Sequence, residues 1–80
     1  MNDTDRQILA AEIGGLIRDA REALGLSVAT LADRLDVSRQ WLTRVEGGET
    51  IPNVRRLVEI AAALEVETAK ILPDRSPCMT

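Results

Sequence analysis

The sequence predicts an all-α protein, folded as one compact domain of five helices. Apolar residues recur along most of the chain at the spacing of one helix face, and no alternating pattern indicates a strand. In addition, Ser27 and Ser38 are each placed to cap a helix, and their spacing requires two short helices joined by a sharp turn. At 80 residues, the chain is expected to form a single domain over residues 1–80.

The first helix is expected from about residue 5 to residue 24. Its apolar face is formed by Leu9, Ile13, Leu16, Ile17, Ala20 and Leu24. Gly25 follows, and glycine readily takes the left-handed conformation that ends many helices. Residues 1–4 are expected to be flexible.

Ser27 caps the second helix, of about eight residues, and Ser38 caps the third. A hydrophobic contact across each helix start can fix how the chain enters the helix. The residues placed for these two contacts are Leu26 with Leu31 and Val37 with Leu42. Together these features predict a helix-turn-helix.

Gly47 and Gly48 end the third helix, and Pro52 with Asn53 opens a fourth. The inner face of the fourth helix consists of Leu57, Ile60, Ala61 and Leu64. A fifth helix of one or two turns is expected at about residues 68–72, ended by Pro73. Residues 73–80 are expected to be flexible.

The formal net charge of −3 argues against a nucleic-acid partner, but the charges are unevenly spread. Residues 38–56 hold four arginines and two glutamates, a local balance of +2. The acidic excess lies in residues 1–37 and 57–80. A basic surface is therefore expected around the third helix and the start of the fourth.

Several classes of protein are disfavoured by the residues present. The chain has no histidine, no plausible pair of nucleophile and base, no phosphate-cradling glycine loop and no cluster of metal ligands, so we expect no enzyme, no cofactor and no metal. The single cysteine, Cys78, is expected to be a free thiol; an intermolecular bridge is the alternative. The polar N-terminus and the lack of a long apolar run predict a cytoplasmic protein without a membrane partner.

Three segments carry a family resemblance: TLADRLDVS, RQWLTRVEGGE and IPNVRRLVEIAAALEV, preceded by IGGLIRDAREALGLS. In this order and spacing, over residues 12–72, the chain resembles the lambda-repressor-like helix-turn-helix family (Cro/cI type, also called XRE). The resemblance implies a five-helix domain that binds double-stranded operator DNA as a homodimer. It also implies that the third helix reads the bases.

The outward face of that third helix carries side chains suited to base recognition. Arginine pairs with guanine through two hydrogen bonds and glutamine with adenine, while threonine can contact a thymine methyl group. The expected base readers are Arg39, Gln40, Thr43 and Arg44. A solvated helix face is the alternative interpretation of these residues.

Contacts to the DNA backbone are expected from Ser27, Ser38, Trp41 and Arg55. For Trp41 a half-buried ring that braces the second helix is an alternative. The resemblance further implies a buried ion pair between Arg21 and Glu46. More apolar residues lie near the fifth helix than a core of this size needs, so Ile71 and Leu72 are expected to form a homodimer interface.

The chain departs from the family pattern at four places. Val28 replaces a glutamine that often contacts phosphate, and Asp36 and Glu65 stand where glycine is usual. Both of these turns are therefore expected to be slightly strained or differently shaped, because neither residue favours the left-handed region. The fourth departure is the early start of the first helix.

Two functions fit these observations. The first is a sequence-specific transcriptional regulator, a repressor or autoregulator, that binds a pseudo-palindromic operator. The alternative is an antitoxin or protein-interaction module whose partner is a toxin or another regulator. Net acidity and Val28 favour this alternative.

Overall fold

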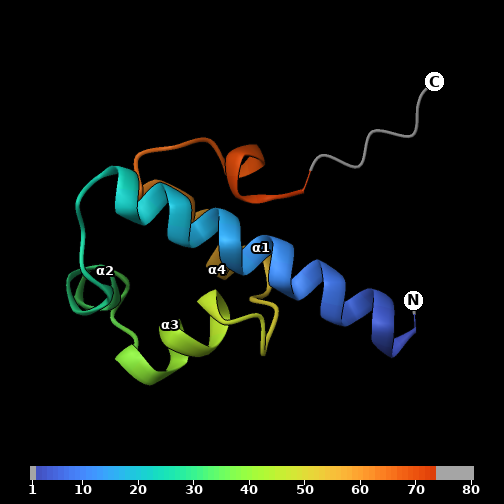
Figure 1. Ribbon diagram of the computed structural model, residues 1–80. Coiled ribbons are helices and arrows are strands. Elements are labelled where there is room, and N and C mark those ends of the chain that lie inside the picture. Colours follow the sequence, from blue (N-terminus) through green and yellow to red (C-terminus); the bar gives the residue numbers. More distant parts are fainter. Residues whose placement is uncertain (1, 74–80) are drawn as a thin grey trace.

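The computed structural model describes residues 2–73, and within this range four α-helices are followed by one turn of 3-10 helix (Figure 1). The elements are α1 (Asp3–Ala23), α2 (Val28–Leu35), α3 (Arg39–Glu46), α4 (Val54–Ala63) and η1 (Thr68–Ile71). The all-α prediction is confirmed. The predicted count of five helices is corrected to four α-helices and the η1 turn.

The short length of η1 has a local cause. Glu67 before it and Leu72 after it are both extended, which leaves four residues for the turn. Four residues are enough for the hydrogen bond between positions i and i+3 that defines a 3-10 turn, and the Lys70 N–H donates such a bond to the Glu67 carbonyl at 2.9 Å. Pro73 disfavours helical backbone at the residue before it, so the helix cannot continue through Leu72.

The start of α1 also differs from expectation. The side chain of Asn2 accepts a hydrogen bond from the Asp5 N–H at 2.8 Å, and Asp3 and Asp5 place acidic groups in the first turn. A cap and negative charge both stabilise a helix N-terminus. Residues 2–4, expected to be flexible, therefore form the cap and first turn of the helix. Residues 74–80 of the predicted flexible tail lie outside the described residues.

A residue with left-handed backbone conformation ends or follows each of the four α-helices. Gly25 (φ 71°) and Gly48 (φ 78°) have no Cβ to oppose this conformation, whereas Asp36 (φ 56°) and Glu65 (φ 61°) adopt it with a side chain. Of the two outcomes expected for these turns, strained or differently shaped, the left-handed backbone at Asp36 and Glu65 agrees with the first, because a Cβ opposes this conformation. In each turn the next N–H bonds back five positions: Leu26 to Arg21 at 3.1 Å, Val37 to Ala32 at 3.0 Å, Glu49 to Arg44 at 2.9 Å and Val66 to Ala61 at 3.0 Å.

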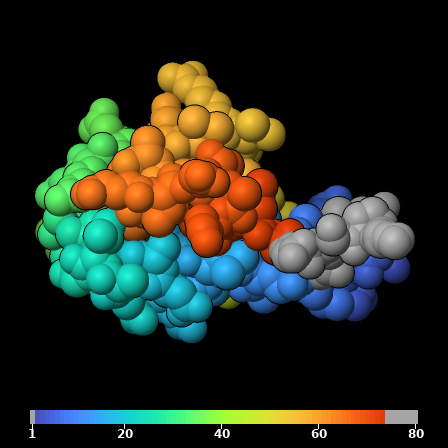
Figure 2. Space-filling model, turned by 90° about the horizontal axis from the view of Figure 1, so that it is seen from above, coloured from blue at the N-terminus to red at the C-terminus, as the bar shows by residue number. Residues whose placement is uncertain are grey.

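One hydrophobic core joins all five elements. Helix α1 packs against α3 and against η1, while α4 contacts α2 and η1 (Figure 1). The largest side chains with less than 2% exposure are Ile17, Leu31, Leu42, Val45, Ile60, Leu64 and Ile71. The N-terminal turns of α1 extend beyond this body (Figures 1 and 2). No helix among residues 2–73 is long and apolar enough to span a bilayer.

Candidate nucleic-acid interface

Helix α3 is amphipathic, with an apolar inner face and a polar outer face. Leu42 and Val45 are fully buried. The four residues predicted to read bases are all exposed and together line one shallow hollow on the surface: Arg39, Gln40, Thr43 and Arg44. The structure thus brings the predicted set together on one face of one helix.

The N-terminus of α3 is held by the predicted cap. The Ser38 hydroxyl accepts the Trp41 N–H at 3.0 Å, as the Ser27 hydroxyl accepts the Thr30 N–H at 3.0 Å at the start of α2. Both serines are exposed, so the Ser38 O–H group can still donate to a ligand, whereas the Ser27 hydroxyl also shares a hydrogen bond of 2.9 Å with the Thr30 hydroxyl. The caps are confirmed; a contact from these serines to DNA stays a prediction.

The C-terminus of α3 is held by unusually close contact with α1. A Cβ on Gly14 would lie 2.7 Å from the Glu46 carbonyl oxygen and would also collide with the Val45 carbonyl. A Cβ on Gly48 would lie 2.9 Å from Cα of Ala11. Two glycines therefore allow α1 to rest directly on the backbone at the end of α3. Sequence reasoning missed the role of Gly14, because a glycine inside a helix does not show what it faces.

The predicted ion pair lies at the same junction. Nε of Arg21 donates to Glu46 Oε2 at 2.7 Å, and Nη2 donates to Oε1 at 3.0 Å. The hydrogen bonds to Glu46 raise the pKa of Arg21, although burial acts in the opposite direction. Glu46 points inward to this pair, so its charge is neutralised away from the outer face of α3.

Two further arginines near α3 are exposed and loosely paired. Nε of Arg44 lies 3.9 Å from Glu49 Oε1, with both side chains more than 60% exposed. Arg55 is 86% exposed, with Nε 3.4 Å from Glu59 Oε2. Exposed pairs of this kind contribute about 0–1 kcal/mol, so both arginines are available to an anionic ligand.

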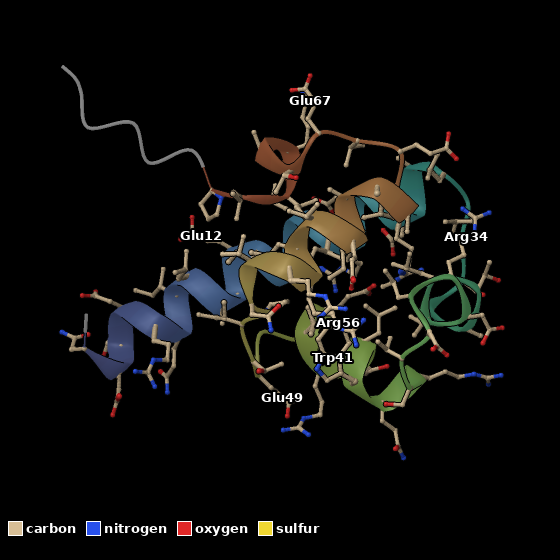
Figure 3. All side chains as sticks on the ribbon, turned by 180° about the vertical axis from the view of Figure 1, so that it is seen from behind. Glu12, Arg34, Trp41, Glu49, Arg56 and Glu67 are labelled. Atoms are coloured by element: carbon tan, nitrogen blue, oxygen red, sulfur yellow. The ribbon has the colours of Figure 1, made fainter. Side chains whose placement is uncertain are left out.

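Trp41 contacts a residue that the sequence did not single out. The Arg56 guanidinium lies over the indole, with Cζ 5.8 Å from the ring centroid. Figure 3 shows the two side chains adjacent, Trp41 from α3 and Arg56 from α4. The ring is half-buried against the core, in agreement with the bracing alternative, although the brace involves α4. No sequence signal distinguished Arg56 from the adjacent Arg55.

Val28 packs partly buried against the core at the start of α2. An aliphatic side chain there cannot donate to a phosphate. Any contact of the α2 N-terminus with an anion therefore depends on backbone N–H groups and on the exposed Ser27 and Thr30 hydroxyls.

The predicted dimer residues lie in different environments. Ile71 is 0% exposed within the core of its own chain, so it offers no surface to a partner and its assignment to an interface is corrected. Leu72 is 37% exposed and borders a shallow groove with Leu16 and Pro73. Its role in assembly stays a prediction. Among the described residues, no group of three or more His, Cys, Asp or Glu is placed to hold a metal ion.

Comparisons with known proteins agree with this geometry. The family described as "Helix-turn-helix domain" matches residues 12–72. The HTH-type transcriptional regulator SlrR of Bacillus subtilis is 38% identical over 60 residues, covering 74% of this chain and 40% of SlrR. A transcriptional regulatory protein of Methanoculleus marisnigri is 38% identical over 66 residues, covering 80% of this chain and 22% of that protein. The chain therefore spans less than half the length of these curated relatives.

Two solved structures share the fold. The restriction-modification controller protein C.AhdI of Aeromonas hydrophila superposes with a TM-score of 0.75 at 28% identity, covering 79% of this chain and 96% of that one. An HTH_3 family transcriptional regulator of Vibrio cholerae gives a TM-score of 0.77 at 27% identity, covering 82% and 37% of the two chains.

Proposed function

This chain belongs to the helix-turn-helix family of transcriptional regulators, and from that premise we propose that it is a cytoplasmic repressor or autoregulator that binds a pseudo-palindromic operator as a dimer. The observation that carries the proposal is the outer face of α3. Its four exposed side chains can all pair with base edges, and the inner face of the same helix is fully buried. A helix anchored in this way can enter a major groove as a rigid unit.

Within this proposal, Arg39 and Arg44 recognise guanine and Gln40 recognises adenine. Thr43 lies between them and contacts a thymine methyl group or a phosphate. Arg55 neutralises a phosphate, as its 86% exposure and position at the start of α4 favour.

Backbone contacts from Ser27, Ser38 and Trp41 complete the proposed interface. The start of α4 and helix α3 can face the same DNA duplex, because both protrude from the same side of the molecule in Figure 2.

Selection from random duplex DNA, followed by gel-shift titration of the enriched sequences, tests the proposal. We expect a site with two inverted half-sites about one helical turn apart, roughly 34 Å between centres. Control titrations against a scrambled duplex of equal length separate specific binding from attraction to phosphates. Enrichment of no sequence, with equal weak binding to both duplexes, would overturn the proposal.

A protein partner is the second candidate function, favoured by the first turns of α1. Asp3 and Asp5 lie on the part of α1 that extends beyond the body of the domain (Figure 1). Ile8, on the same turns, is 48% exposed. A basic partner such as a toxin could bind there. Truncation of residues 1–8 should abolish such binding and leave operator affinity unchanged.

A further inference from the structure

Two adjacent arginines at the start of α4 have different environments. The Arg55 side chain is 86% exposed, whereas that of Arg56 is 38% exposed and turns toward the body of the domain. The two residues are equivalent in charge and neighbours in sequence. Their difference in burial indicates a difference in role.

Arg56 contacts two other helices and one residue of its own helix. Its Nη1 atom donates to the Leu35 carbonyl at 3.3 Å, at the last residue of α2, and to Glu59 Oε1 at 3.0 Å within α4. Its guanidinium also lies over the Trp41 ring, in the first turn of α3. The α2 contact is electrostatically favourable, because the last carbonyls of a helix carry partial negative charge.

One of these contacts, the one with Trp41, joins two elements that otherwise meet little. Among the described residues, the closely packed pairs of elements are α1 with α3 and η1, α2 with α3 and α4, and α4 with η1. The pair α3 and α4 is not one of them. The cation–π contact of Arg56 with Trp41 is therefore a side-chain link between the start of α4 and the start of the helix that carries Arg39 and Gln40 (Figure 3).

We infer that Arg56 is a positioning residue: by holding Trp41 it sets the orientation of the first turn of α3, and with it the bases that Arg39 and Gln40 can reach. The inference rests on the proposed function. Arg56 is less suited than Arg55 to a phosphate contact, because Glu59 lies closer to Arg56, at 3.0 Å against 3.4 Å, and the Leu35 carbonyl uses one of the Arg56 donors. Arg55 is the matched control, since it has the same charge, an adjacent position and an exposed side chain.

The experiment compares the parent, Arg56→Ala, Arg56→Lys and Arg55→Ala by random-site selection and by the salt dependence of operator binding. For Arg55→Ala we expect the parent's base preference and a slope of log K against log salt smaller by about one unit. For Arg56→Ala we expect an unchanged slope and a loss of about tenfold in preference at the base pairs that Arg39 and Gln40 read. Arg56→Lys should recover at most part of this preference, because one ammonium cannot lie over the indole and also bond to the Leu35 carbonyl and Glu59, as the larger guanidinium does.

Trp41 provides a second measurement that needs no DNA. It is the chain's single aromatic residue, so fluorescence reports on this ring alone. We expect Arg56→Ala and Arg56→Lys to shift the emission to longer wavelength and to lower the anisotropy of the ring, whereas Arg55→Ala should leave both unchanged. Circular dichroism confirms that each variant is folded; if Arg56→Ala unfolds, the comparison of Arg56→Lys with Arg55→Ala decides alone.

The outcomes separate the two proposals. If the parent enriches no sequence, the proposed function is wrong and this inference falls with it. If the parent enriches an operator and both Arg56 variants select the same one, only the inference is wrong. If Arg56→Ala has a smaller salt slope than the parent and Arg56→Lys restores the parent's slope, Arg56 contacts a phosphate. This result would also overturn the inference.

Discussion

Arg21 holds the Glu46 carboxylate with two nitrogens and the Leu26 carbonyl with the third, Nη1, at 2.7 Å. One guanidinium from α1 therefore fixes both the end of α3 and the turn that leads into α2. The two side chains are 11% and 7% exposed, so water competes little for these bonds. This arrangement contributes more to the geometry of the helix-turn-helix than to its net stability, because ion pairs that leave water also lose hydration.

Replacing Arg21 by alanine should destabilise the domain by about 3–5 kcal/mol, because the Glu46 charge would be left buried without a partner. A domain of this size has a total stability of about 5–10 kcal/mol, so the loss removes between about a third and all of it, and the melting temperature should fall by more than about 10 °C. Thermal melts by circular dichroism measure the loss. Arg18→Ala, an exposed arginine on the same helix, is the control and should lie within about 0.5 kcal/mol of the parent.

The raised pKa of Arg21 adds a pH test. A raised pKa means that the charged form is favoured by folding, so this contribution is complete below the ordinary arginine pKa and is lost only as the pH rises through the raised value. The gap in melting temperature between parent and Arg21→Ala should therefore be constant from about pH 7 to 9. A gap that closes within this range would contradict the assigned role.

Gly14 and Gly15 are adjacent in α1 and should respond oppositely to alanine. At Gly14 a Cβ would meet the Glu46 carbonyl, so Gly14→Ala should cost about 1–3 kcal/mol by forcing α1 away from α3. At Gly15 nothing lies within 4 Å, so Gly15→Ala should stabilise the helix by about 0.5–1 kcal/mol. Chemical denaturation of both variants measures the two changes. Equal effects would mean that the close approach of α1 to α3 is absent.

Sequence reasoning succeeded here for features determined by nearby residues. The caps at Ser27 and Ser38 and the left-handed backbone at Asp36 and Glu65 depend on residues within a few positions, and all were predicted. The contact of Gly14 with the end of α3 and the contact of Arg56 with Trp41 were not, because each joins residues from different helices. The pair of Arg21 with Glu46 also joins two helices, and it was predicted only from the family resemblance. Without the fold, no local pattern distinguishes Gly14 from Gly15 or Arg56 from Arg55.

The strained turns at Asp36 and Glu65 predict which glycine substitution stabilises the domain. At φ 61°, Glu65 gains little from local hydrogen bonding to offset the strain of its Cβ. Glu65→Gly should therefore stabilise the domain by about 0.5–1 kcal/mol, a net figure that already subtracts the entropy cost of a more flexible glycine in the unfolded chain. Asp36→Gly should gain less, since aspartate tolerates this region better. Glu65→Ala retains the Cβ and should show no gain in denaturation experiments. A gain for Glu65→Ala equal to that for Glu65→Gly would rule out backbone strain as the cause.

Replacing Arg44 by alanine should change base preference without changing stability. Its pair with Glu49 is exposed and long at 3.9 Å, so the melting temperature should stay near that of the parent. Within the proposed function, selection should lose about 1–3 kcal/mol of discrimination at one symmetric pair of operator positions. The other positions should keep their preference. An unchanged selected site would remove Arg44 from the set of base readers.

Leu72 and Ile71 are neighbours whose substitution separates assembly from folding. Ile71 is fully buried, so Ile71→Glu would place a charge in the core and should unfold the chain. Leu72 is 37% exposed, so Leu72→Glu should keep its helical circular dichroism and, if the proposed dimer uses this surface, become monomeric. Sedimentation velocity measures the oligomeric state, and operator affinity should fall with the dimer, because each monomer must then bind its half-site alone. A folded Leu72→Glu variant that remains dimeric would place the interface elsewhere, and the exposed Ile8 on α1 would be the next residue to test.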